Sequence, residues 1–329
     1  MNHKLKAILT VLSTAMLIGC SKPPTDDCAP VEIHRFDRAA YRYDTADSAD
    51  RQAIRDTFAV ALRIMLGNDI SDSSLTAYSQ SRGVRVFTPD IESRFLSLDS
   101  IEAVTGCIYS RMGDEFPDIT PPEIYSAAIT YNQSIILADT VMLLGLNHYL
   151  GCDYEGYNYL DSYRRATKTA TRLPYDIAES IIATAYPFRP SNDATVLSRL
   201  LYEGALVKAV MLLVPDSDTA TALGYDKSQL TWLAENEAPA WSALIERKML
   251  YSTDMDVASR LTAAAPHTTL LHPQSPGRAG RYIGLRIIES YMKRHPEATL
   301  RQMLDSTFYN SASPLIRSGY NPSRLRAPI

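Results

Sequence analysis

The chain has 329 residues, with 33 Lys and Arg against 37 Asp and Glu, and a formal net charge of −4. This mildly acidic balance excludes the basic field that nucleic-acid-binding proteins use. Hydrophobic residues make up 46% of the chain, which is enough to predict a packed core.

The first twenty residues predict a lipoprotein signal. A basic start is followed by the apolar run Ala7–Ile18, which is too short to span a membrane, and then by the lipobox-like Leu17-Ile18-Gly19-Cys20. We therefore expect residues 1–19 to be cleaved and Cys20 to carry the lipid, palmitate included. The expected location is the cell envelope, with the outer membrane favoured. A plain secretory signal with a chance cysteine is the alternative.

Residues 20–30 are polar and proline-rich, which predicts an extended tether. No later apolar run reaches about 18 residues, so we expect residues 31–329 to form a single soluble domain held at the membrane by its lipid. The formal charge becomes −6 once Lys4 and Lys6 leave with the signal. Membrane contact is therefore expected through the lipid rather than through a basic patch.

Three cysteines follow the lipobox, at Cys28, Cys107 and Cys152. An odd number allows at most one intramolecular disulfide, which the periplasm would permit, but the sequence does not select the pair. No Cys-x-x-C motif is present, and this argues against a thiol redox function.

The first part of the domain, about residues 31–118, is expected to be helical. Apolar residues with helical spacing predict helices over Asp50–Leu66 and from about Asp99 to Met112. The period then changes, and short apolar runs between turn residues predict two or three strands, over Tyr125–Thr130, Ser134–Ala138 and Val141–Leu146.

After about residue 158 every predicted element is a helix. The expected helices are Tyr159–Thr169, Tyr175–Ala185, Asp193–Val214, Lys227–Tyr251, Arg278–Arg294 and Thr299–Ser306. The predicted fold class is therefore α+β, mostly helical, with a small β-sheet.

The helix over Asp193–Val214 is apolar almost all the way round, which predicts a central, buried helix. Glu203 and Gly204 lie in its middle. A buried carboxylate needs a partner, a metal or a proton, and a helical glycine costs about 1 kcal/mol against alanine, so close packing is expected there. Glu203 either pairs with Arg199 at a water-lined rim or belongs to a buried network or remnant site.

Several stretches resemble the gliding-motility lipoprotein GldB of Bacteroidetes, from about residue 120 to 310. They are Leu144–Gly151, Leu201–Ala205, Leu223–Tyr225, Trp232–Trp241, Tyr251–Asp254 and, best of all, Ser275–Gly284, with the lipobox and Ile33–Asp37 at the front. The resemblance implies an envelope component associated with gliding motility or type IX secretion.

That family is in turn similar to predicted zinc peptidases, which carry His-Glu-x-x-His on one helix and Glu-Gly on the next. Glu203-Gly204 matches the second helix, and the first falls near Glu179. No histidine lies between His148 and His267. The resemblance therefore implies a zincin-like part, about residues 119–310, that has lost its metal centre and needs no cofactor.

The segment Ser275–Gly277 is expected to open a helix, and Gly280 and Gly284 predict close helix packing. Tyr282 is either a core aromatic residue with a bonded hydroxyl or a residue that lines the old cleft. The degenerate zincin positions are then Glu179, Glu203, Gly204 and Tyr282.

The leading hypothesis is a non-catalytic envelope lipoprotein that works with other envelope, motility or secretion proteins. One alternative is a surface lipoprotein that binds glycans or peptides, because the 20 tyrosines could supply a binding platform. The other is a divergent metal-dependent hydrolase with Glu179, Glu203, His148 and His267 as candidate ligands.

Overall fold

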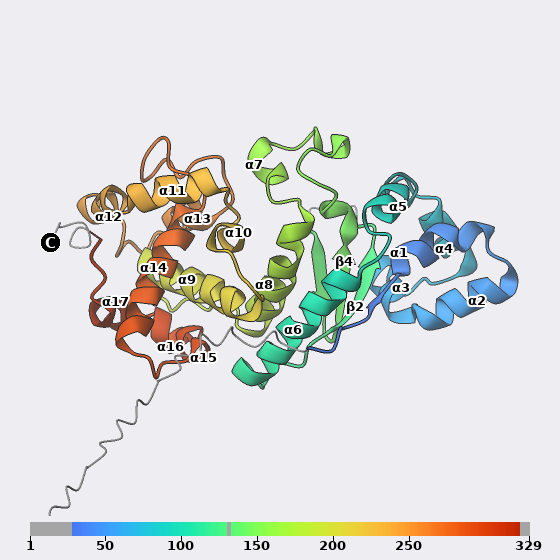
Figure 1. Ribbon diagram of the computed structural model, residues 1–329, viewed down its shortest axis with the longest axis horizontal. Helices are drawn as coiled ribbons and strands as arrows, with labels where there is room; N and C mark the ends of the chain where they lie inside the picture. The colour runs from blue at the N-terminus through green and yellow to red at the C-terminus, as the bar shows by residue number, and fades with distance from the viewer. Residues whose placement is uncertain (1–27, 130–132, 323–329) are drawn as a thin grey trace, which may run out of the picture.

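The computed structural model describes residues 28–129 and 133–322 (Figure 1). Cys20 and most of the predicted tether lie outside these residues. The described chain is mostly helical with one four-stranded sheet, which confirms the α+β class. Within these two ranges, no helix is both long and apolar enough to cross a membrane.

The sheet lies at the centre of the molecule. Its strands are β1 (Ile33–His34), β2 (Glu123–Ala127), β3 (Ile135–Ala138) and β4 (Val141–Gly145). Their order is β1-β2-β4-β3, in which β3 alone runs antiparallel to its neighbour. The three predicted strands are confirmed, whereas β1 is too short to have a recognisable period.

Helices cover both faces of the sheet, because alternate strand residues point to opposite sides. Tyr125 and Leu143 pack with the amino-terminal helices, whereas Met142 and Leu144 join the larger core of the carboxyl-terminal half. The amino-terminal helices are α1 (Phe36–Arg42), α2 (Ser48–Thr57), α3 (Ala59–Leu66), α4 (Asp72–Ser79) and α5 (Arg82–Arg94), and the 3-10 helix η1 (Tyr43–Thr45) follows α1.

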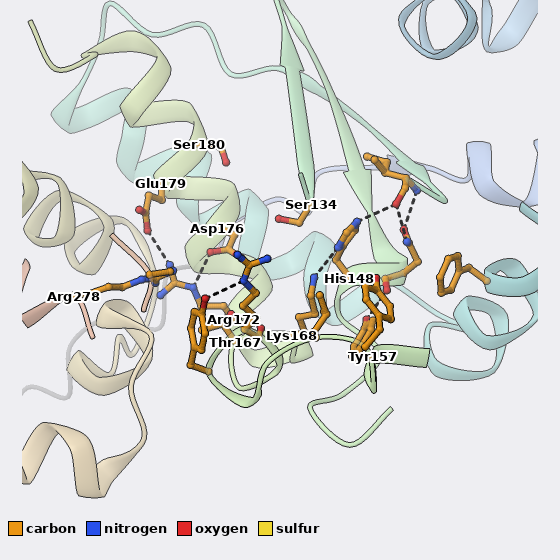
Figure 2. A pocket seen from close by; sticks show the side chains of 18 of the residues that line it. Ser134, His148, Tyr157, Thr167, Lys168, Arg172, Asp176, Glu179, Ser180 and Arg278 are labelled. Carbon is orange, nitrogen blue, oxygen red and sulfur yellow. Dashed lines mark hydrogen bonds and ion pairs between the residues drawn. The ribbon is translucent and has the colours of Figure 1, made fainter. Parts of the chain in front are cut away.

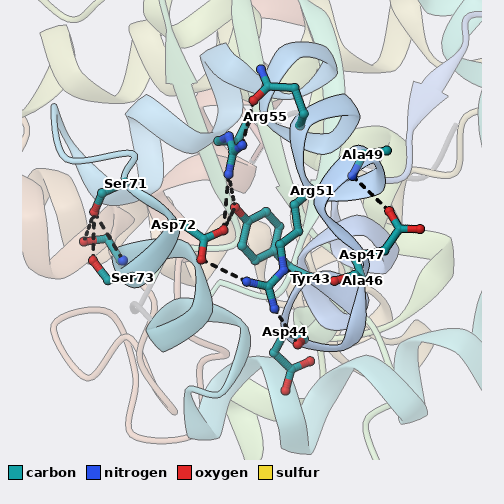
Figure 3. A network of polar contacts seen from close by, with 12 residues as sticks. Tyr43, Asp44, Ala46, Asp47, Ala49, Arg51, Arg55, Ser71, Asp72 and Ser73 are labelled. Atoms are coloured by element: carbon teal, nitrogen blue, oxygen red, sulfur yellow. Dashed lines mark hydrogen bonds and ion pairs between the residues drawn. The ribbon is translucent and has the colours of Figure 1, made fainter.

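A polar network holds three of these amino-terminal segments together (Figure 3). The Tyr43 hydroxyl donates to Asp72 Oδ1 over 2.9 Å, and Arg51 Nη1 donates to Asp72 Oδ2 over 2.9 Å. Arg55 Nη1 donates to the Tyr43 oxygen over 2.6 Å. The network therefore ties α2 to η1 and to the start of α4.

A disulfide joins Cys28 to Cys107 on α6 (Asp99–Glu115) and leaves Cys152 exposed as a free thiol. The structure thus selects one of the pairings that the sequence left open. The disulfide fixes the start of the described chain to the helical layer beside the sheet, where Val31 N also donates to the Glu102 carbonyl over 3.1 Å.

The carboxyl-terminal half packs around α9 (Val196–Leu213), whose residues are almost all buried, as predicted. Its long partners are α8 (Leu173–Ala185) and α14 (Ala279–Arg294). The remaining helices are α7 (Ser162–Arg165), α10 (Thr219–Leu223), α11 (Lys227–Glu235), α12 (Glu237–Glu246), α13 (Met255–Thr262), α15 (Leu300–Met303), α16 (Ser306–Tyr309) and α17 (Ser313–Ser318).

Three predicted helices are interrupted. The expected helix over Asp50–Leu66 breaks at Phe58, and that over Lys227–Tyr251 breaks at Asn236, because both residues leave helical backbone angles. The helix predicted from Thr299 is divided between α15 and α16, because Asp305 begins a new helix by accepting from Thr307 N.

The helix predicted over Tyr159–Thr169 is wrong for most of its length. Only the four residues of α7 are α-helical there, after the 3-10 helix η3 (Glu155–Tyr157). Tyr159 is 78% exposed, so its apolar ring does not mark a buried helical face. The segment is a loop that covers one end of the sheet.

The predicted close packing is found where α9 crosses α14. A Cβ atom on Gly204 would overlap the backbone of Gly284, and one on Gly284 would overlap the Leu200 carbonyl. On Gly280 it would lie 2.8 Å from the Leu261 carbonyl oxygen. The two backbones therefore touch at a distance that only glycine permits.

We expect Gly204→Ala to lower the free energy of unfolding by at least about 2 kcal/mol, because neither backbone can yield without separating α9 from α14. Urea denaturation measures this. The control is Gly113→Ala on α6, where an added Cβ meets nothing within 4 Å. That change should raise stability by about 0.5–1 kcal/mol. Equal effects of the two substitutions would contradict the crossing.

Candidate functional site

A pocket of about 750 Å³ lies where the carboxyl ends of β2 and β4 meet α8 (Figure 2). The loop that contains Tyr157, Tyr163 and Lys168 forms one wall, and Asp176 and Glu179 on α8 form another. Arg278, just before α14, completes it. Ligands of sheets with parallel strands commonly bind at this end of the strands.

The wall at the strand ends is rigidly built. The side-chain amide of Asn147 accepts from Ile129 N over 2.9 Å and donates to the Ile129 carbonyl over 2.8 Å. His148 Nε2 lies 3.0 Å from the same carbonyl, and its Nδ1 lies 2.7 Å from Lys168 Nζ. Because a lysine ammonium only donates, this arrangement requires neutral His148 with its proton on Nε2.

The electrostatics of His148 agree with that tautomer. Burial and, to a smaller extent, the positive charge of Lys168 lower the pKa of His148 to about 4. Both imidazole nitrogens are already engaged. His148 is therefore a fixed structural donor and acceptor rather than a proton carrier near neutral pH.

The carboxylates of α8 are held by Arg172, whose side chain is almost fully buried. Its Nε donates to Asp176 Oδ1 over 2.7 Å, and its Nη2 donates to Glu179 Oε2 over 2.8 Å. The second oxygen of Asp176 accepts from the Tyr149 hydroxyl over 2.9 Å. Each acidic group of this wall thus has a charged or hydroxyl partner.

Arg281 of α14 links the carboxylates of α8 and α9. Its Nη2 donates to Glu179 Oε1 over 2.7 Å, and its Nε lies 2.9 Å from Glu203 Oε2. The other oxygen of Glu203 lies 2.7 Å from Arg199 Nη2. Glu203 therefore pairs with Arg199, as the first alternative stated, but it is 6% exposed and belongs to a buried network rather than to a water-lined rim.

These contacts set the charge of Glu179. Burial opposes its ionisation, but the charges of Arg281, Arg172 and Arg278 outweigh burial and lower the pKa of Glu179 to about 2. The same pairing raises the pKa of Arg172 and Arg281 against the effect of their burial. Glu179, Arg172 and Arg281 are therefore ionised throughout the physiological pH range.

The arrangement does not fit the zinc ion that the zincin-like expectation would require. All four oxygens of Glu179 and Glu203 face arginines, so a divalent cation would have to displace Arg281 and lie beside two further guanidinium groups. Within residues 28–129 and 133–322, no three His, Cys, Asp or Glu side chains gather as a metal site.

The other predicted site residues lie apart from the pocket. The Tyr282 hydroxyl donates to Glu237 Oε2 over 2.8 Å in a second hollow, so Tyr282 is a buried aromatic residue with a bonded hydroxyl. His267 and His272 are exposed and do not line the pocket. Gly204 contributes only through the α9–α14 crossing, and Cys20 lies outside the described residues.

Sequence reasoning missed the basic residues of the site, which are Arg172, Arg278, Arg281 and Lys168. One signal was available, because Arg278 and Arg281 lie inside Ser275–Gly284, the stretch with the best resemblance. Arg172 also precedes Asp176 by four residues, a spacing that pairs side chains on a helix.

The fold and the site define a mostly helical α+β protein whose pocket is built from arginine–carboxylate pairs rather than metal ligands. A family model described as gliding motility protein GldB matches residues 21–322, and its name designates a lipoprotein family. The chain therefore belongs to the GldB family. No curated protein and no solved structure matches the chain.

We expect the stability of the protein to fall as the pH decreases from about 5 to 2. The folded pKa of Glu179 lies below its usual 4.5, so its stabilisation is present above that value and lost on acidification. The loss amounts to about 3 kcal/mol. Urea denaturation across this range should show Glu179→Gln with a flatter acid dependence and lower stability at pH 7, because two buried arginines lose a partner.

The matched control is Glu235→Gln, since Glu235 is exposed on α11. This variant should keep the acid dependence of the unaltered protein. If Glu179→Gln also kept it, Glu179 would not carry the lowered pKa.

Proposed function

We propose that the chain is a non-catalytic lipoprotein of the bacterial cell envelope, anchored through a lipid on Cys20. It would act as a structural or assembly component of gliding or type IX secretion machinery, in a member of the Bacteroidetes and at the outer membrane. The observation that carries the proposal is membership of the GldB family over residues 21–322, together with the arginine-bound carboxylates of the pocket.

The chemistry of the pocket supports a role without catalysis. A general base works best when its pKa lies near the working pH. Glu179, with a pKa of about 2, and His148, with a pKa of about 4, are both far below it. Each is also bound to basic neighbours, so neither offers a free lone pair to a substrate proton.

We further infer that α8 and α9 correspond to the two metal-binding helices of zinc peptidases. Support comes from their placement, because Glu179 on α8 and Glu203 on α9 share the one guanidinium of Arg281. In this proposal, the guanidinium of Arg281 neutralises the carboxylates of Glu179 and Glu203. A zinc peptidase would use its metal ion there. The hydrolase alternative would have to recruit His267, which is exposed and outside the pocket.

A binding role is the second candidate, and the pocket favours it. Its volume of about 750 Å³ lies within the range of small-molecule sites, and tyrosines line its mouth. An anchored protein that both joins envelope partners and holds a ligand would combine the two candidates.

The test is complementation of a deletion strain with the unaltered gene, Cys20→Ala and His148→Gln. We expect deletion to impair gliding or type IX secretion, and Cys20→Ala to fail to restore it, because the unlipidated protein cannot stay at the membrane. His148→Gln should restore it, since glutamine keeps an amide donor and no proton transfer is required. Crosslinking of a tagged chain should recover envelope partners only when Cys20 is present.

Immunoblots must show equal amounts of the three proteins. Unchanged secretion and motility after deletion would contradict the proposed role. Loss of function in His148→Gln at a normal melting temperature would contradict the non-catalytic part of the proposal.

A further inference from the structure

The pocket holds more positive than negative charge. Four cations line it, namely Arg164, Lys168, Arg172 and Arg278, against the two carboxylates Asp176 and Glu179. Both carboxylates are already bound to Arg172, and Glu179 is also bound to Arg281. The other three cations have no ion pair with any residue that the structure describes.

Arg278 is the clearest case. It is half-buried with a left-handed backbone (φ 62°), and its guanidinium has no hydrogen bond or ion pair within residues 28–129 and 133–322. Gly224 makes room for it, because a Cβ there would lie 3.0 Å from Arg278 Nη1. Burial lowers the pKa of Arg278, and repulsion from Arg281 adds to this effect despite the charge of Glu179. The side chain is thus a partly desolvated cation with no hydrogen-bonded or ion-paired partner among the residues that the structure describes.

Lys168 provides a second point of positive charge. Its ammonium gives one N–H to His148 Nδ1 over 2.7 Å and lies 5.3 Å from the centre of the Tyr157 ring. An ammonium has three N–H donors, and the described residues supply no carboxylate for the other two. Figure 2 shows Lys168 and Arg278 on opposite sides of the pocket, with Arg172 and Asp176 between them.

We propose that this pocket binds a small organic anion that carries at least two carboxylate or phosphate groups. One acidic group would bind Arg278 and another would lie toward Lys168, because charge-assisted hydrogen bonds to a guanidinium or ammonium are the strongest contacts available there. The exposed ring of Tyr159 and the side chain of Tyr163 at the mouth would contact the body of the ligand. This inference goes beyond the proposed function, which names no ligand.

The experiment titrates citrate and pyrophosphate into the full-length lipidated protein in detergent, at pH 7 and low salt. Calorimetry should detect saturable binding of at least one probe, and a saturating probe should raise the melting temperature by about 2–4 °C. Acetate should bind more weakly, and glucose should not bind. Citrate alone would identify a carboxylate ligand, and pyrophosphate alone would identify a phosphate ligand.

Arg278→Gln should weaken binding at least about tenfold. Without a probe it should lower the melting temperature only slightly, because Arg278 loses a through-space attraction to Glu179 but no hydrogen bond or ion pair with a described residue. The matched control is Arg63→Gln on α3, which is exposed and lies on the other side of the sheet. It should bind like the unaltered protein.

If Arg278→Gln fails to fold, Arg164→Gln and Lys168→Gln serve instead, each with an expected loss of affinity of about twofold or more. Absence of saturable binding by both probes, or equal affinity in the Arg278→Gln and Arg63→Gln variants, would overturn the inference. Because binding is measured on purified protein, failure here is distinguishable from a failed complementation, which bears on the proposed function alone.

Discussion

The carboxyl-terminal half depends on the guanidinium group of Arg281, which joins Glu179 of α8 to Glu203 of α9. Buried charges are tolerated only when they are paired, and removal of one partner of such a pair typically costs about 3–5 kcal/mol. Arg281 is 5% exposed and meets both carboxylates, while Arg172 and Arg199 complete the alternation of charges at its two ends. The result is a continuous series of ion pairs across α8, α9 and α14. Without Arg281, the like charges of Glu179 and Glu203 would lie near each other with no cation between them.

The glycine crossing makes this bridge possible. Gly284 lies one turn after Arg281 and touches the backbone of α9, where Gly204 directly follows Glu203. Because α9 and α14 are in close contact, the side chain of Arg281 can contact the Glu203 carboxylate. The same placement of α14 brings Arg278 to the pocket, where no carboxylate of the described chain is left for it. One packing constraint thus explains the stable network and the surplus charge beside it.

Much of the fold could be predicted from local pattern. The strands over residues 123–145 and the buried helix α9 were predicted correctly, because their patterns of apolar residues are strong and extend over enough residues to be recognised. The break at Phe58 was not predicted, because no glycine or proline marks it. The break at Asn236 was not predicted either, although Pro239 is a local signal for it, since proline has no N–H to donate to the Glu235 carbonyl. The two-residue β1 forms a strand only because β2 is beside it.

The site was predictable only where partners are close in sequence. The Arg199–Glu203 pair is spaced by four residues and was one of two alternatives drawn from the sequence, whereas Arg281 and Glu179 are 102 residues apart. No local pattern indicates that Arg281 and Glu179 are in contact. The sequence therefore predicts that the buried Glu203 needs a partner, but it does not identify Arg281 as that partner. The absence of a histidine between His148 and His267 was informative, because it excluded a His-Glu-x-x-His pair on the helix near Glu179 before any geometry was known.

The central claim is that arginines, not a metal ion, neutralise Glu179 and Glu203. The most direct test is the zinc content and melting temperature of the full-length protein after exposure to excess Zn²⁺ and, separately, to EDTA. The account predicts no stoichiometric zinc after desalting and the same melting temperature in both conditions. One tightly held zinc per chain that raises the melting temperature and is removed by EDTA would contradict it.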